Sequence, residues 1–329
     1  MPRPSLLSLH GVRIDQARVP ILRNVCLTIG EAETFAVLGA SPQTLTGLME
    51  VLAGWRHPQS GTVSLDGRDV FGRPRRQLAL LPGRRTVWSR AWRGTGPDLL
   101  RAVGDLLAQK PRLLLLDQPT TGLAPHDRAA LLDMLDALCG RGGPAVVYAT
   151  TSFAEVLAVA DRAAVIGAGE IRQVGTPRDI YDRPADPGVA TLSGDINLLP
   201  GRVTGLEDDL VQVRLDAGCG TEAAQPEWTP PIEPGERCVV GIRPERVALA
   251  AIPASMLGDG AMAARVEAAR FRGDHVGVRL RVGSDDHGFV ITSKRHPDLP
   301  PRELSPGAAV SVAWQPHDAR LFRPEPHSQ

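Results

Sequence analysis

The sequence lacks any apolar run that approaches the roughly 18 to 20 residues needed for a membrane-spanning helix. Its first residues, MPRPSLLSLHG, also lack an apolar stretch long enough for a secretory signal peptide. We therefore expect a protein that stays in the cytoplasm. If it serves a membrane process, it does so as a peripheral subunit.

Cysteine is scarce and scattered. The four cysteines are Cys26, Cys139, Cys219 and Cys238, and no two of them form a C-x-x-C pair. This spacing argues against a disulfide framework or a zinc site and favours reduced thiols in the cytoplasm. The eight histidines show no metal-ligand spacing either.

The chain has no excess charge of either sign, because 37 basic residues balance 37 acidic ones. A balanced charge gives no argument for nucleic acid or an anionic membrane surface as a partner. The 329 residues are 43% apolar, so the chain can bury a substantial core. This length predicts one large domain and one smaller one.

The first part of the chain alternates strand and helix patterns. Apolar strands are expected in ILRNVCLTI, ETFAVLG, LLLLD and PAVVYAT, and hairpins in GTVSLDGRDV and RAAVIGAGEIRQVG. Helices are expected at residues 46–53, 127–138 and 153–160. Strands that alternate with helices predict a largely parallel α/β core with both sheet faces covered.

The pattern changes past about residue 194. Short alternating segments such as LVQVRLDAG, RCVVGIRPERVAL and VGVRLRVG recur between glycine and proline turns. This texture is typical of a small all-β barrel. We therefore expect two domains, residues 1–190 and 195–322, with the boundary between 184 and 195.

The stretch AVLGASPQTLTGLMEVLAG runs from an apolar strand through a turn of small residues into a helical pattern. This is the frame of a phosphate-binding loop, G-x-x-x-x-G-K-[ST]. Gly39 fills its first position and Thr46 its last, but Thr44 replaces the second glycine. Leu45 replaces the lysine, and Pro42 removes one backbone N–H donor. The frame is present without its phosphate-binding groups.

Five segments together resemble the ATP-binding subunits of ABC importers, of the polyamine, sugar and iron type with a C-terminal TOBE-like domain. In chain order they are VLGASPQTLTGLMEVLAG, SGTVSLDGRDV, RLLLLDQPTTGLAPHDR, ADRAAVIGAGEIRQVGTPRDIYDRPAD and VVGIRPERVAL. The resemblance covers nearly the whole chain. It implies a P-loop NTPase-like ABC nucleotide-binding domain followed by a small all-β domain of the OB/TOBE-like class.

The resemblance also implies ATP and Mg²⁺ as cofactors and assigns positions to them. The metal would take Thr46 and Asp117, and the phosphate-loop frame would comprise Gly39, Ser41, Thr44, Leu45 and Thr46. No lysine precedes Lys110, so no other lysine near the loop replaces the missing one. An arginine from elsewhere in the chain remains an alternative. We expect weak or absent nucleotide binding.

Further catalytic positions of the family hold other residue types. Gln118 stands in the place of the general base, and an amide cannot take up a proton at neutral pH. Thr151 stands in the place of the switch histidine, and Gly83 in that of the glutamine that senses the γ-phosphate. Gln77 lies close to Gly83 and is a possible substitute. No aromatic residue matches the adenine-stacking position.

The helical subdomain of the family is shortened here. Only about ten residues separate Gly83 from RGTGP (residues 93–97), which aligns with the family's signature motif. The alternative is that RGTGP is a linker into the helix PDLLRAVGDLLAQ.

The cluster RRTVWSRAWRG (residues 84–94) is interpreted as a partner-contacting or capping segment, with a plain surface loop or a nucleic-acid stacking surface as alternatives. His126 falls in the stretch that would contact the opposite subunit, or is an exposed residue at a helix start.

The favoured interpretation is a degenerate ATP-binding subunit that pairs with a competent ABC ATPase at the inner face of the cell membrane. Its partners would also include membrane permease subunits, and it would form a hetero-oligomer that binds no nucleic acid. One alternative is a weakly active ATPase that uses Gln118 and Thr46. Another is a cytosolic regulator that binds a ligand through its β domain.

Overall fold

The computed structural model of the chain forms two compact units, Met1–Asp182 and Arg183–Gln329. Residues 5–17, 19–71, 85–88, 96–108, 111–137, 143–207, 210–224, 232–250, 261–283, 289–295 and 304–324 are described. Each unit is treated by itself. None of the described helices is long and apolar enough to cross a membrane.

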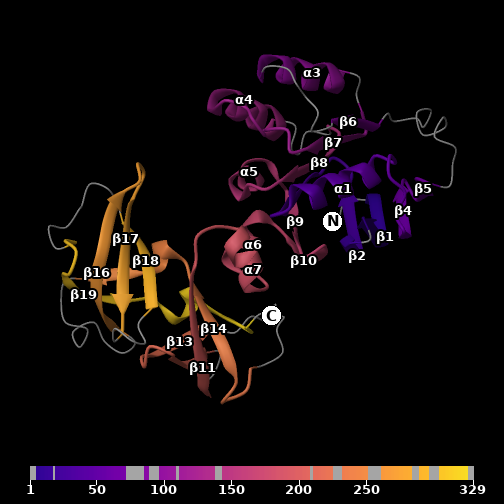
Figure 1. Cartoon of the computed structure of the whole chain (residues 1–329). Coiled ribbons are helices and arrows are strands. Elements are labelled where there is room, and N and C mark those ends of the chain that lie inside the picture. The colour runs from indigo at the N-terminus through magenta and orange to yellow at the C-terminus, as the bar shows by residue number, and fades with distance from the viewer. Residues whose placement is uncertain are drawn as a thin grey trace. The chain divides into compact units, whose positions relative to one another are not determined.

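The first unit contains a four-stranded antiparallel sheet with the order β2-β1-β4-β5 (Figure 1). Its strands are β1 (Ser5–Gln16), β2 (Val19–Gly30), β4 (Ser60–Leu65) and β5 (Arg68–Asp69). Asp66 and Gly67 turn between β4 and β5 with φ values of 53° and 68°. Positive φ at both central residues is the two-residue hairpin geometry, so the expected hairpin is confirmed.

A six-stranded sheet with the order β10-β9-β3-β8-β7-β6 forms the centre of the first unit. Its strands are β3 (Thr34–Gly39), β6 (Arg85–Trp88), β7 (Leu113–Asp117), β8 (Ala145–Thr150), β9 (Arg162–Gly167) and β10 (Glu170–Gly175). Neighbouring strands are parallel except for β10, which pairs antiparallel with β9. The expected, largely parallel α/β core is confirmed.

Strand β7 carries apolar side chains on both faces of this sheet, so both faces must be buried. Leu113 and Leu115 belong to the core shared with α1 (Pro42–Leu52) and the antiparallel sheet. Leu114 and Leu116 point the other way, into a core built with α3 (Gly96–Ala108) and α4 (Pro125–Asp136). A continuous apolar run is therefore buried on alternate sides, as expected for an internal parallel strand.

Two further helices are described in the first unit, α5 (Phe153–Val159) and α6 (Pro177–Asp182). The helices expected at 127–138 and 153–160 are present with ends shifted by one or two residues. The helix expected at 46–53 differs more, because α1 begins four residues earlier, at Pro42. This early start changes the candidate site.

Apart from α7 (Pro187–Leu192) and short 3-10 turns, the second unit is described as strands. One group of these strands forms a closed barrel in the order β11-β12-β13-β20-β14. Its strands are β11 (Asn197–Glu207), β12 (Leu210–Leu215), β13 (Gly220–Ala224), β14 (Arg237–Ile242) and β20 (Ala319–Phe322). The all-β class expected for this part of the chain is confirmed.

A five-stranded sheet follows the barrel, with the order β15-β19-β16-β17-β18. Its strands are β15 (Ala248–Ala250), β16 (Met262–Phe271), β17 (Val276–Val282), β18 (Phe289–Arg295) and β19 (Ala309–Ala313). One hydrophobic core contains buried residues from both the barrel and this sheet, such as Val240 and Val278. The two sheets therefore fold as a single unit.

The segment GIRPE contains a buried arginine, Arg243, that stabilises the start of the second unit through hydrogen bonds. Arg243 is 7% exposed, and its Nη1 donates to the backbone oxygens of Ala190, Gly194 and Asp195 at 3.0–3.1 Å. Its Nη2 donates to Ser193 Oγ at 2.8 Å. The planar guanidinium satisfies several acceptors at the carboxyl end of α7, where helix carbonyls lack partners.

We predict that Arg243→Ala loosens this end of the second unit. Three backbone oxygens would lose a charged donor, and a hydrogen bond to a charged group is worth roughly 1.5–3 kcal/mol. Amide hydrogen exchange in peptides that span residues 187–195 should accelerate by about a hundredfold.

The matched control is Arg237→Ala in β14. This exposed arginine pairs with Asp216, and an exposed ion pair contributes little to stability. Exchange in the same peptides should stay within about threefold of the unaltered protein. Equal acceleration in both variants would contradict the role given to Arg243.

Candidate functional site

The candidate site lies at the carboxyl edge of the six-stranded sheet. Strand β8 lies between β3 and β7 and is parallel to both, with Leu38 opposite Thr150 and Asp117 opposite Ala149. The three strands therefore end at one edge. The segments that follow them carry the residues that the sequence singled out for phosphate, metal and water chemistry.

The segment after β3 turns directly into helix α1. Pro42 occupies the start of the helix, and the Ser41 hydroxyl accepts a hydrogen bond from the Thr44 backbone N–H at 3.3 Å. The Leu45 N–H donates to the Ser41 carbonyl at 3.2 Å. Serine before proline is a strong helix-start signal, which explains the early start of α1. Residues 42–45 are helical and do not form an open loop.

The Leu45 side chain belongs to the hydrophobic core. It is fully buried, and a Cβ built at Gly39 would lie 3.4 Å from its Cδ2 atom and 3.4 Å from the Ile166 carbonyl oxygen. Leu45 therefore packs over the Gly39 backbone. The position that holds lysine in the phosphate-loop pattern points here into the protein interior.

Thr46, Asp117 and Gln118 meet in one hydrogen-bonded cluster. Thr46 Oγ1 donates to Asp117 Oδ2 at 2.8 Å, and Gln118 Nε2 donates to Asp117 Oδ1 at 3.1 Å. The same Gln118 nitrogen lies 3.3 Å from the Pro42 carbonyl and 3.4 Å from Thr46 Oγ1. Asp117 and Gln118 are 3% and 7% exposed. The cluster links the first turns of α1 to the end of β7.

These residues fit the two proposed cofactors differently. The Thr46 hydroxyl and the Asp117 carboxylate are oxygen ligands of the kind that Mg²⁺ prefers. A triphosphate needs converging backbone N–H groups and a cation. Here the N–H groups of Thr44 and Leu45 are bonded to Ser41, and Leu45 is buried. The donor set suits a metal ion, and the described phosphate-loop residues do not fit a triphosphate. The described residues contain no cluster of three or more His, Cys, Asp or Glu side chains that could hold a metal.

Thr151 follows β8 and is exposed to solvent, whereas the preceding Thr150 is buried. The described contacts do not join Thr151 to the cluster of Thr46, Asp117 and Gln118. It lies at the same sheet edge only through the adjacency of β7 and β8. A threonine hydroxyl there cannot perform the proton and charge chemistry of an imidazole.

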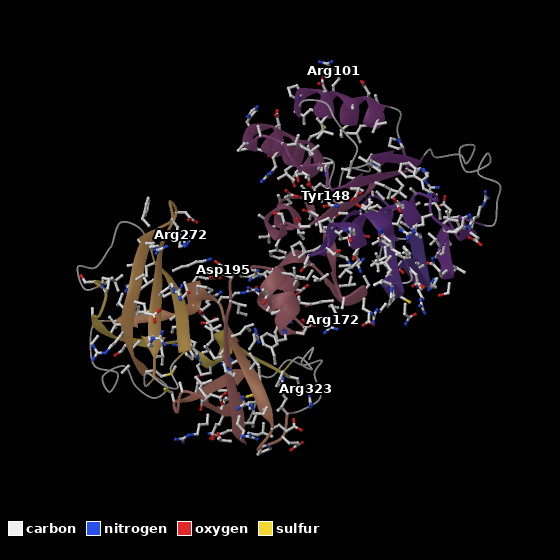
Figure 2. The ribbon with its side chains drawn as sticks, viewed as in Figure 1. Arg101, Tyr148, Arg172, Asp195, Arg272 and Arg323 are labelled. Atoms are coloured by element: carbon white, nitrogen blue, oxygen red, sulfur yellow. The ribbon has the colours of Figure 1, made fainter. Side chains whose placement is uncertain are left out.

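Sequence reasoning missed a second polar cluster behind this edge. The buried carboxylate of Glu155 accepts hydrogen bonds from Thr120 Oγ1 at 2.7 Å, Tyr148 OH at 2.9 Å and Thr150 Oγ1 at 2.6 Å. Arg128 Nε lies 3.9 Å from the same carboxylate. Figure 2 labels Tyr148 within the first unit. The only sequence signal was a tyrosine inside the apolar run VVYAT.

The environment of Glu155 also fixes the protonation of its neighbour. Burial, and next the adjacent Glu155 carboxylate, raise the pKa of Tyr148 well above its ordinary value. Tyr148 therefore stays protonated and donates its hydroxyl hydrogen to Glu155. The cluster holds two threonines in fixed positions. Thr120 lies two residues after Gln118, and Thr150 lies directly before Thr151.

The remaining positions singled out by the sequence are only partly described. Gly83 and Gln77 lie outside the described residues, as do residues 93–95 of RGTGP. Gly96 starts α3 and packs so closely on Asp127 that an added Cβ would lie 2.0 Å from that side chain. His126 is exposed, and its Nε2 lies 3.4 Å from Asp127 Oδ1. Within the tryptophan and arginine cluster, residues 85–88 form strand β6, which the sequence did not predict.

Comparison with known proteins decides the family. The TOBE domain family matches residues 240–322. The Fe(3+) ions import ATP-binding protein FbpC of Streptomyces coelicolor is 32% identical over 360 residues, which cover 96% of this chain and 96% of that protein. The chain belongs to the ATP-binding subunits of ABC importers.

Another member of the family is similar over a comparable length. The spermidine/putrescine import ATP-binding protein PotA of Ruegeria pomeroyi is 29% identical and aligns with 97% of this chain and 96% of its own. The crystal structure of a nucleotide-free ATP-binding cassette from an ABC transporter aligns with a TM-score of 0.49 at 15% identity, covering 57% of this chain and 98% of that chain. The sequence motifs predicted an ABC importer ATP-binding subunit, and the two relatives named above confirm this prediction.

We predict that Glu155→Gln destabilises the first unit by about 2 kcal/mol. A neutral amide offers only one oxygen to the hydroxyls of Thr120, Tyr148 and Thr150, and hydrogen bonds to a charged acceptor are worth roughly 1.5–3 kcal/mol each. Urea unfolding of the full chain measures the change in free energy.

Glu170→Gln in β10 is the matched control, because Glu170 is exposed. A surface substitution of this kind should change the free energy of unfolding by no more than about 0.5 kcal/mol. If the two variants unfold at the same urea concentration, the Glu155 cluster does not stabilise the sheet edge.

Proposed function

We propose that this ABC importer subunit is hydrolysis-deficient and works beside a catalytically competent ABC ATPase. The observation that carries the proposal is the burial of Leu45 in a helix that already begins at Pro42. A lysine at that position of the pattern reaches the β- and γ-phosphates. Leucine directed into the core supplies no charge to an anionic nucleotide.

The chemistry at the end of β7 supports the same proposal. Hydrolysis needs a group that accepts a proton from water, and the Gln118 amide cannot accept one at neutral pH. Its nitrogen is already directed toward Asp117, Pro42 and Thr46. Gln118 therefore orients its neighbours and does not activate water. Bound Mg²⁺ would supply only charge stabilisation to phosphate oxygens, and Thr46 and Asp117 would be the residues to hold it.

The proposed partners follow from the family. Importer ATP-binding subunits work with membrane permease subunits, and the relatives named above serve import of polyamines or ferric ions. We place this chain at the cytoplasmic face of the membrane as a peripheral subunit. Residues 195–322 would form the TOBE-like half that contributes to pairing, after a nucleotide-binding domain of residues 1–190.

One observation favours a second candidate, a weakly active ATPase. The Thr46 hydroxyl and the Asp117 carboxylate remain in direct contact at 2.8 Å, so a metal-binding pair is still assembled. Such an enzyme would depend on Asp117 and would have to reach the phosphates without the loop lysine. Measured turnover separates the two candidates.

We predict that the purified chain hydrolyses Mg-ATP no faster than buffer alone. General acid–base catalysis contributes about 10² to 10⁴-fold, and this chain has an amide in place of the base. The assay is phosphate release from the full chain, with Asp117→Asn as the matched variant. A turnover number near about 1 s⁻¹ that Asp117→Asn abolishes would overturn the proposal.

The Leu45→Lys variant tests the structural reason in the same assay. Because Leu45 is fully buried, a lysine there should lower the free energy of unfolding by about 2 kcal/mol or more without producing turnover. A variant that keeps full stability and gains ATP hydrolysis would show that the loop opens readily.

We predict that the chain forms a heteromer with a competent ABC ATPase encoded beside it. Its TOBE domain matches the family over residues 240–322, whereas its phosphate-loop lysine is replaced by Leu45. The assembly region is therefore preserved better than the catalytic one. After co-expression, size-exclusion chromatography with light scattering should give the mass of a complex that contains both chains.

The control is the same measurement on each protein alone. A chain that elutes strictly as a monomer, with and without the candidate ATPase, would contradict the pairing. A complex that forms only when a permease is also present would still support a transporter subunit, because the permease belongs to the same assembly.

A further inference from the structure

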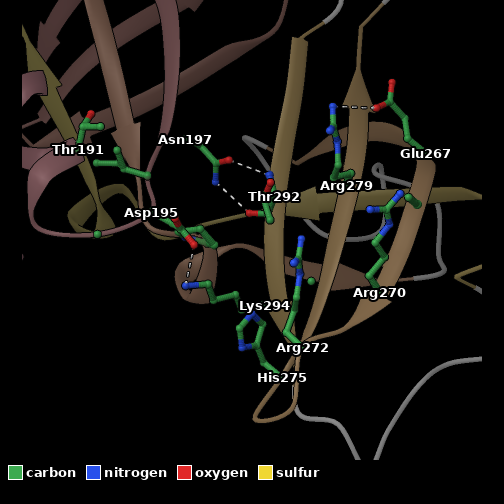
Figure 3. Close-up of a pocket in the computed structure, with 15 residues that line it drawn as sticks. Thr191, Asp195, Asn197, Glu267, Arg270, Arg272, His275, Arg279, Thr292 and Lys294 are labelled. Carbon is green, nitrogen blue, oxygen red and sulfur yellow. Dashed lines mark hydrogen bonds and ion pairs between the residues drawn. The ribbon is translucent and has the colours of Figure 1, made fainter. Parts of the chain in front are cut away.

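A cavity of about 870 Å³ opens within the second unit, beside the outer face of the five-stranded sheet (Figure 3). Its walls come from three places in the sequence: the end of α7 through the start of β11, Pro244, and strands β16 to β18 with the turn that joins β16 to β17. The described lining residues lie between 191 and 294. These residues all belong to the second unit.

The lining carries an excess of positive charge. Among the described lining residues, Asp195 and Glu267 are acidic. The cationic lining residues are Arg270, Arg272, Arg279 and Lys294, with His275 beside them. Figure 3 shows these basic side chains as one group at the sheet. A concentration of like charges in a concave site focuses a positive potential that attracts anions.

Both acidic groups are already paired. Glu267 accepts from Arg281 Nη2 at 2.6 Å and lies 3.7 Å from Arg279 Nη2, and Asp195 lies 3.3 Å from Lys294 Nζ. Arg270 and Arg272 make no ion pair or side-chain hydrogen bond with the described residues. Two guanidinium groups thus remain available to an incoming ligand.

The strand register leaves an open floor among the cations. Gly277 lies opposite Arg270 on β16 and opposite Lys294 on β18, so the three positions form one row across the sheet. Adjacent strands lie about 4.8 Å apart, which separates the Arg270 and Lys294 backbones by roughly 10 Å. The glycine between them has no side chain, so the space above β17 stays open.

The neighbouring row places an arginine at its centre and small or polar residues on either side. Ala268 lies opposite Arg279, and Arg279 lies opposite Thr292. Asn197 fixes the far wall, because its side chain donates to the Thr292 carbonyl at 3.0 Å and accepts from the Thr292 N–H at 2.7 Å. A rigid polar wall, a small-residue floor and flanking cations are the features of a preformed ligand pocket.

We propose that this cavity binds a small organic molecule that carries two anionic groups. One group would be held by Arg270 and Arg272, and the other would lie near Lys294 across the Gly277 floor. Arginine binds carboxylate and phosphate oxygens in a bidentate manner, so either group satisfies the site. The described lining residues include no phenylalanine, tyrosine or tryptophan on which bases could stack, which favours a small molecule over nucleic acid.

The test is isothermal titration calorimetry of the full chain with citrate, pyrophosphate and acetate in low-salt, metal-free buffer. Citrate and pyrophosphate each carry several anionic groups, of the carboxylate and phosphate classes respectively, and acetate carries one. At least one of the first two should bind with a dissociation constant below about 1 mM, and at least tenfold more tightly than acetate. The tighter of the two identifies the class of anionic group.

Two variants locate the binding in the cavity. Arg270→Gln combined with Arg272→Gln should weaken binding by about tenfold or more, because charge-assisted hydrogen bonds are lost. Gly277→Val should weaken it equally without changing any charge. An added Cβ at Gly277 lies no closer than 3.8 Å to other atoms, so the strand tolerates the substitution while the floor fills.

Matched controls keep the result specific. Arg214→Gln removes an exposed strand arginine outside the cavity, and Gly220→Val places valine at a strand glycine with nothing within 4 Å of its Cβ. Both should leave the affinity within about twofold. The proposal is overturned if neither citrate nor pyrophosphate binds below about 1 mM. It is also overturned if Arg214→Gln weakens binding as much as the cavity variants.

Discussion

Strands β3, β7 and β8 lie parallel and adjacent, and this constraint places the segments that follow them at one edge of the sheet. The arrangement depends on burial of both sheet faces, since alternate leucines of β7 enter two separate cores. Nothing at that edge has to be catalytic for the sheet to form. The geometry of a nucleotide site therefore persists when the residues that would serve the nucleotide change.

At the start of α1, a helix-start signal stands in place of an open phosphate loop. A phosphate loop keeps its backbone N–H groups unpaired so that they face the ligand. In this chain Ser41 and Pro42 start the helix, and the N–H groups of Thr44 and Leu45 are bonded to Ser41. The chain gains helical hydrogen bonds and a buried leucine at the position where a working loop would hold a charged side chain.

The sequence predicts the parts of the fold that follow from apolar periodicity, such as β7 and the hairpin at Asp66. The resemblance to ABC importer subunits also predicts that Thr46 and Asp117 converge, because it assigns both residues to one metal ion. The sequence did not predict the early helix start at Pro42, because the phosphate-loop pattern was read as a loop. The Glu155 cluster was missed because its hydroxyl donors come from separate segments and leave no periodic signal.

Asp117 and Gln118 interact directly, so a substitution of Gln118 by glutamate alone would not restore the family's catalytic site. Both Asp117 oxygens accept hydrogen bonds, one from Thr46 and one from the Gln118 amide at 3.1 Å. A glutamate at position 118 would replace that donor with a second negative charge at a similar distance, and two adjacent carboxylates resist joint ionisation. The amide is thus a neutral hydrogen-bond donor to this buried carboxylate. Restoring the family's base demands a cation at Asp117 in the same step, and the loop that would bring one with the nucleotide is closed by Leu45.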